Sequence, residues 1–123
     1  MRYLLLVHSP VSRWDELPAE GTDADMEGHA SLIGSLTDTE RLVACSPLGH
    51  PATGRRVMVR EGLATAVELS VCGSAVAGFY LIEARDLEDA IAVAQQIPDA
   101  RTGHVEVRPL LPLEGIAGGP ALA

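Results

Sequence analysis

Apolar and polar positions along the chain fall into short segments whose spacing indicates both strands and helices. Alternating or continuous apolar runs bounded by proline, glycine or charged residues are typical of strands. Two longer segments, 22–36 and 86–97, repeat their apolar residues every three or four positions, as amphipathic helices do. Strands are predicted for residues 2–8, 41–45, 56–60, 63–69, 75–83 and 104–108.

The first predicted helix has an apolar face, and His29 lies on it. The other members of this face are Met26, Ala30, Leu32, Ile33 and Leu36.

The second predicted helix begins after Asp86, a favourable N-cap residue, and ends before Pro98, which cannot continue a helix. Its apolar stripe is expected to be buried, with Phe79 of the preceding strand packed beside it. The stripe consists of Leu87, Ala90, Ile91, Ala94 and Ile97.

Two glycines carry specific structural expectations. Glu61-Gly62 separates two strands by two residues, and this spacing predicts a β-hairpin because glycine accepts positive φ. Gly78 interrupts an otherwise apolar strand, which indicates a bulge or the close approach of another backbone.

The order of these elements predicts an α+β domain with a ferredoxin-like βαββαβ layout and an inserted hairpin. Both helices would cover one face of an antiparallel sheet. The bare face would then be covered by a second copy, so a homodimer is expected. One domain is predicted over residues 1–110, followed by a C-terminal tail at 111–123 that contains several Pro and Gly residues.

Composition and charge narrow the range of partners. The formal charge is −8, and the basic residues are scattered arginines with no lysine, so nucleic acid is not an expected partner. No apolar run is long enough to span a membrane, and no signal peptide is expected. Cys45 and Cys72 lack metal-ligand spacing and are read as reduced thiols of a cytoplasmic protein, although a disulfide between them is the alternative.

Several blocks resemble the YCII-related superfamily, in particular its DGPF-type branch. The resemblance covers about nine-tenths of the chain, and its C-terminal blocks are the specific ones. The blocks are Met1 to Leu6, His29, Leu42 to Ala44, Val59 to Gly62, Gly78 to Leu87 and Val105 to Pro109.

The resemblance implies a ferredoxin-like fold that dimerises into an α+β barrel with a cavity. Some relatives have a histidine–carboxylate pair proposed as catalytic, and at least one is a lyase that removes chloride from a chlorinated hydroquinone. This chain lacks the Asp-Gly-Pro-Phe run, because residues 66–74 replace it. Ser46 stands where an acid often follows the second strand in relatives.

His29 is the first candidate catalytic residue, as a general acid or base. Glu68, the acid nearest the altered loop, is the candidate partner. The plainer interpretation of His29 is a core histidine bonded to a backbone carbonyl. His29 matches the family position, and this gives the catalytic interpretation the same weight as the structural one.

A second group of candidates lies on the last strand. His104, Glu106 and Arg108 alternate, so they share the face opposite the core. Arg108 is suited to hold a carboxylate or phenolate, and His8 at the end of the first strand is placed with them as substrate-binding. The alternative is an ion pair that fixes the dimer. No metal site or cofactor is expected, since no pair of His8, His29 and His104 has ligand spacing.

Two functions remain open from the sequence. The first is a dimeric protein that binds a small molecule in a cavity, with lyase- or hydrolase-type proton transfer by His29. The second is an accessory module without catalysis, consistent with the missing signature loop.

Overall fold

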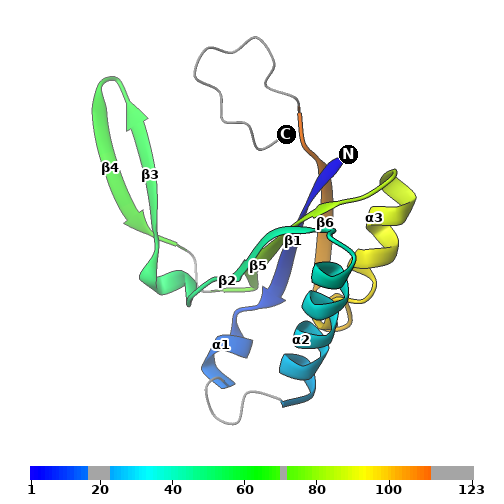
Figure 1. The fold of residues 1–123 in the computed structure, drawn as a ribbon. Coiled ribbons are helices and arrows are strands. Elements are labelled where there is room, and N and C mark those ends of the chain that lie inside the picture. The colour runs from blue at the N-terminus through cyan, green and yellow to red at the C-terminus, as the bar shows by residue number, and fades with distance from the viewer. Residues whose placement is uncertain (17–22, 70–71, 112–123) are drawn as a thin grey trace.

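The computed structural model describes residues 1–16, 23–69 and 72–111 and shows an α+β fold (Figure 1). Every predicted strand and both predicted helices are present, with bounds that differ by a few residues. The predicted tail lies, apart from Leu111, outside the described residues. The elements are β1 (Arg2–Pro10), α1 (Ser12–Glu16), α2 (Asp23–Asp38), β2 (Leu42–Pro47), η1 (Pro51–Thr53), β3 (Arg55–Arg60), β4 (Leu63–Glu68), β5 (Ser74–Glu83), α3 (Leu87–Ala94), η2 (Pro98–Ala100) and β6 (His104–Pro109).

Four strands form an antiparallel sheet in the order β2-β5-β1-β6. The first strand of the chain is therefore central, flanked by the two strands that come last. The order is consistent with the predicted ferredoxin-like arrangement, in which a later strand separates β1 from β2. Helices α2 and α3 lie on the same side of this sheet (Figure 1).

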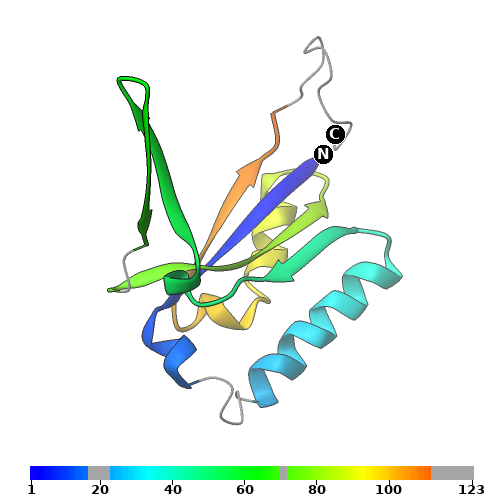
Figure 2. The same ribbon diagram turned by 90° about the vertical axis from the view of Figure 1, so that its left-hand side faces the viewer.

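The core lies between the sheet and these two helices. Along β1 the side chains alternate, and Tyr3, Leu5, Val7 and Ser9 are buried while the residues between them are half-buried. This alternation gives the sheet one covered face and one open face, which is turned toward the viewer in Figure 2.

The buried stripe of α3 differs from the prediction at Leu87 and Ile91, and Ile91 is only half-buried. Phe79, expected beside the stripe, is also half-buried and lines the pocket described below. Ala90, Ala94 and Ile97 are buried as expected, and Val93 joins them. Leu87 is 46% exposed, because it occupies the first turn beside the Asp86 cap, where the helix has not yet reached the sheet. The cap itself is confirmed, since the Asp86 carboxylate accepts the backbone N–H of Asp89 at 2.9 Å.

The segment after β1, for which the apolar pattern predicts neither strand nor helix, contains the short helix α1. Trp14 in α1 donates its indole N–H to the carbonyl of Leu48 at 3.2 Å. It also lies beside the ring of His50. This contact ties α1 to the segment after β2, as expected for the only tryptophan of the chain.

Gly78 meets both expectations. A Cβ atom there would lie 2.8 Å from the carbonyl oxygen of Ser46, so the β2 backbone needs a glycine opposite it. The pairing of β1 with β5 also shifts register between Val7 and His8, directly after the Val7–Gly78 pair.

Strands β3 and β4 pair with each other as a separate two-stranded antiparallel sheet. The connecting residues Glu61 and Gly62 have φ of 52° and 78°, the positive values that a type I′ turn requires. Both views show this hairpin standing away from the four-stranded sheet (Figures 1 and 2).

Candidate functional site

His29 projects from α2 toward the sheet and contacts Tyr80 on β5. Its Nδ1 lies 2.6 Å from the Tyr80 hydroxyl, and the two rings are nearly parallel, with centroids 6.0 Å apart. The Tyr80 residue is buried, whereas the His29 side chain is 30% exposed. The pair therefore joins the core to a surface that a ligand can reach.

Asp99 in η2 holds the other side of the His29 ring. His29 Nε2 lies 2.8 Å from Asp99 Oδ1, and the hydroxyl of Ser9, at the end of β1, donates to Asp99 Oδ2. Ser9 is fully buried and Asp99 nearly so. Four residues from four elements, β1, α2, β5 and η2, thus form one continuous hydrogen-bonded network.

Close helix packing brings His29 to Asp99. Gly28, next to His29, lies so near η2 that a Cβ atom there would sit 2.7 Å from Pro98 Cγ. Any larger residue would push α2 away from η2. The absence of a side chain at position 28 therefore allows the hydrogen bond one residue further along the helix.

The charge states of the network follow from its surroundings. Burial alone would raise the pKa of Asp99, but hydrogen bonds from His29 and Ser9, together with the positive charge of Arg13, hold this pKa below its usual value. Asp99 is therefore a carboxylate at neutral pH and can only accept, so His29 Nε2 carries a proton.

Tyr80 is held in its neutral form. Burial, reinforced by the nearby Cys45 and Asp99, raises the pKa of the Tyr80 phenol. With neutral His29, the Tyr80 O–H donates to Nδ1 and the imidazole N–H donates to Asp99.

This network forms part of the wall of a pocket of about 490 Å³. His29, Tyr80, Asp99, Ser9 and Arg13 supply polar groups to its wall. The remaining wall is largely apolar and comes from α1, α2, β2 and β5. It includes Trp14, Met26, Ala30, Ile33, Leu48 and Phe79.

The apolar face predicted for the first helix thus divides in two. Leu32 and Leu36 are buried in the core, whereas Met26, Ala30 and Ile33 line the pocket. Met26 is 68% exposed, so this part of the face is open to a ligand rather than packed.

The expectation that Glu68 is the acid nearest His29 is wrong, since Asp99 is hydrogen bonded to the ring. Glu68 is exposed at the end of β4, in register with Arg55 of the hairpin. It does not line the pocket. The reason is that β3 and β4 form their own sheet and do not continue the one beneath His29.

The second group of candidates is brought together, but away from this pocket. His8 Nε2 lies 3.3 Å from Glu106 Oε1, and Arg108 donates to Glu106 Oε2 at 3.0 Å. The rings of His8 and His104 stack with centroids 4.3 Å apart. All four residues lie on the open face, and none of them lines the pocket.

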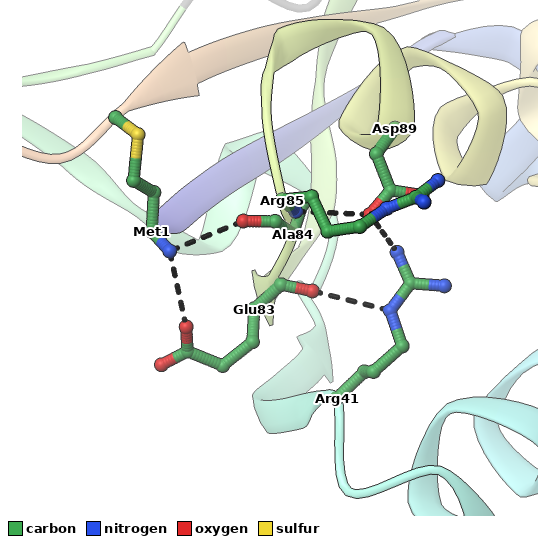
Figure 3. Close-up of a pocket in the computed structure, with 6 residues that line it drawn as sticks. All are labelled: Met1, Arg41, Glu83, Ala84, Arg85 and Asp89. Atoms are coloured by element: carbon green, nitrogen blue, oxygen red, sulfur yellow. Dashed lines mark hydrogen bonds and ion pairs between the residues drawn. The ribbon is translucent and has the colours of Figure 1, made fainter.

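A second hollow, of about 470 Å³, lies where β5 leads into α3 (Figure 3). There Arg41 donates to the carbonyl of Glu83 at 3.2 Å and to Asp89 at 3.0 Å. Asp89 also accepts the backbone N–H of Arg85 at 3.0 Å, which lowers the pKa of Asp89. These contacts join the residue before β2 to β5 and α3, so the residues around this hollow have a structural role.

The described ranges contain neither a metal-binding cluster nor a membrane-spanning helix. No three His, Cys, Asp or Glu side chains there are arranged to hold a metal ion. None of the helices in those ranges has both the length and the apolar character to cross a membrane.

The fold and the pocket define a small α+β domain with a histidine–aspartate pair on a pocket wall. A family model described as the YCII-related domain matches residues 1–114, and the chain belongs to that family. Comparison with curated proteins gives no match.

Proposed function

We propose that this protein binds a small organic molecule in the pocket beside α2 and exchanges a proton with it through His29 and Tyr80. The observation that carries the proposal is the Asp99–His29–Tyr80 chain of hydrogen bonds on the pocket wall. An aspartate that fixes the tautomer of a histidine is a recurrent arrangement in acid–base catalysis.

Tyr80 is the group through which His29 reaches a ligand in this proposal. Both ring nitrogens of His29 already have protein partners, so neither is free to meet a substrate directly. While the Tyr80 hydroxyl donates to His29, its oxygen still has lone pairs that accept a hydrogen bond. A proton leaving the ligand would pass to the Tyr80 oxygen as the phenolic proton passes to Nδ1.

The lining supports a ligand that is mostly apolar and has one acidic or polar group. Apolar side chains make up most of the wall, and the hydrogen-bonded residues Ser9, His29, Tyr80 and Asp99 lie together in it. A phenol or a small carboxylic acid has this form. The reaction class that fits is a lyase or hydrolase step in which a proton is removed or returned at that group.

The wider assignment is part of the same proposal. We place the chain in the DGPF-type branch without its signature, with a ferredoxin-like fold that carries the β3–β4 hairpin as an insertion. Two copies would cover each other's open sheet face and form an α+β barrel. Cys45 and Cys72 are not joined in a disulfide, and we place the chain in the reducing cytoplasm.

Binding of 4-nitrophenol tests the proposal directly. Trp14 lines the pocket and is the only tryptophan, so its fluorescence should fall as this probe binds. Ala30→Phe should abolish the change by filling the pocket. Ala92→Phe, at an exposed position on α3, should leave it intact. Equal quenching in both variants would show that the probe does not bind in this pocket.

Proton exchange is tested with the same probe. The phenol and phenolate forms of 4-nitrophenol absorb at different wavelengths, so the spectrum of the bound probe reports its ionisation. Tyr80→Phe should retain binding but change the bound phenolate fraction across the pH titration. An unchanged titration in Tyr80→Phe would remove Tyr80 from the proposed path.

A second candidate function is a non-catalytic accessory module. The observation in its favour is that both nitrogens of His29 and both oxygens of Asp99 have protein partners. Such a network would hold α2, η2 and the sheet together without chemistry. His29→Ala separates the two functions, because it should abolish binding of the probe while the domain stays folded if the first is correct.

A further inference from the structure

The β3–β4 hairpin pairs with no other strand of the described residues, yet it exposes several large apolar side chains. Apart from half-buried Met58, every residue from 55 to 68 is exposed. The large apolar members Val57, Val59, Leu63 and Val67 are between 44% and 68% exposed. An isolated two-stranded hairpin is only marginally stable in water. A partner is therefore needed for this element.

The two outer edges of the hairpin differ in charge. Strand β3 carries Arg55, Arg56 and Arg60, whereas β4 is uncharged until Glu68 at its end. Charged side chains on an edge strand are a common protection against pairing. Two β3 edges side by side would set arginines of one copy beside those of the other, closer than about one Debye length, ~8–10 Å. The unprotected edge is β4.

The hairpin register shows which groups on β4 point outward. Arg60 and Leu63 flank the two-residue turn, and such a closing pair is hydrogen bonded. Hydrogen-bonded and non-hydrogen-bonded pairs then alternate along an antiparallel ladder. The backbone groups of Ala64 and Ala66 therefore face away from β3. In the described ranges no other strand pairs with this edge.

We infer that β4 pairs antiparallel with β4 of a second copy of this chain, so that the two hairpins form one four-stranded sheet across a two-fold axis. This inference rests on the proposed homodimer and assigns it a second contact. Antiparallel pairing of identical strands is isologous and closes after two copies, which avoids open-ended assembly.

The strand is complementary to itself. With the axis at Ala66, Ala64 lies opposite Glu68 of the second copy; with the axis at Thr65, Ala64 lies opposite Ala66. Neither register sets like charges against each other, and both use the N–H of Ala66.

The surface area that a stable dimer must bury also favours two contacts between the copies, one through the open sheet face and one through the hairpin. A standard interface takes roughly 20–30 residues from each partner and buries at least about 1,200 Å² in total. The open face of one four-stranded sheet supplies only the outward side chains, about half of the residues in its strands. The hairpin, residues 55–68, adds the remainder.

Proline substitution separates the two edges. Ala66→Pro removes an outward N–H and leaves the hydrogen bonds within the hairpin, as proline on an edge strand does. Val57→Pro does the same on β3, directly across in register, and is the matched control. Sedimentation should show a dimer dissociation constant raised about tenfold or more by Ala66→Pro, and within about threefold of wild type for Val57→Pro.

Hydrogen exchange of the unsubstituted protein gives an independent reading. The amides of Ala64 and Ala66 should exchange about tenfold more slowly at protein concentrations above the dimer dissociation constant than at concentrations below it. Exchange of the Thr65 amide, which faces β3, should change little. Unchanged exchange at Ala66, with a dimer present, would overturn the β4 contact even if a proline variant failed to fold. A dimer with the same dissociation constant in Ala66→Pro would also overturn it and leave dimerisation through the open face standing. A wild-type monomer would overturn both.

Discussion

At the scale of single residues, the most informative feature is a carboxylate that sequence patterns left unnoticed. Asp99 is buried, hydrogen bonded by His29 and Ser9, and ionised at neutral pH. A buried charge is tolerated only when it is paired and hydrogen bonded. The network therefore depends on Asp99 as much as on His29.

Asp99→Asn should reveal this dependence through pH. Because the folded-state pKa of Asp99 is below its usual 3.8, ionised Asp99 stabilises the fold above that value. At pH 7 the free energy of unfolding of the variant should be about 1–3 kcal/mol lower than that of wild type. The difference should shrink as the pH falls through the folded pKa, when wild type also loses the charge.

Urea unfolding of wild type and Asp99→Asn measures this difference in stability at pH 7 and at pH 3. Asp38→Asn, at an exposed position on α2, is the control and should show no comparable effect at pH 7. A stability gap between wild type and Asp99→Asn that is constant across this range would contradict the charged role of Asp99.

At the scale of elements, the sequence predicted the strands and helices well but did not predict their contacts. Periodicity located α2, α3 and the sheet strands because burial imposes it on each element separately. It did not find Asp99, because η2 is a single turn with no period of its own. A signal was present in Gly28, since a glycine inside a helix often marks close packing.

Gly28→Ala should confirm that packing. The added methyl would sit 2.7 Å from Pro98, so α2 must shift and weaken the bond from His29 to Asp99. We expect a loss of about 1–3 kcal/mol in the free energy of unfolding, as for other overpacked sites.

Gly34→Ala in the same helix is the matched control. It would contact nothing within 4 Å, and alanine is favoured over glycine in a helix, so it should stabilise by about 0.4–1 kcal/mol. If both variants stabilise the protein equally in thermal or urea unfolding, α2 does not depend on a glycine against η2.

At the scale of the whole molecule, the two faces of the sheet have separate roles. The covered face holds the core and the network, while the open face carries Leu4, Leu6 and the cluster around Glu106. The shared face of His104, Glu106 and Arg108 was predictable from strand alternation. Their distance from His29 was not, because it depends on which face the helices cover.

Leu6→Glu tests whether the open face is an interface. A charge placed among half-buried leucines should raise the dimer dissociation constant about tenfold or more. Ala92→Glu, exposed on α3, should leave it unchanged. Sedimentation at several concentrations measures both, and an unaltered Leu6→Glu dimer would mean that the open face remains uncovered.

The central position of β1 has a consequence for how the chain folds in the cell. Its two neighbours, β5 and β6, lie at residues 74–83 and 104–109, so both edges of β1 stay unpaired until most of the chain has been made. At about 5–20 residues per second, synthesis from the end of β1 to the end of β5, residues 11–83, takes roughly 4–15 s. During that time the leucine-rich strand β1 is outside the ribosome without either of its partner strands. We expect a chaperone that binds exposed apolar segments to bind β1 in this interval.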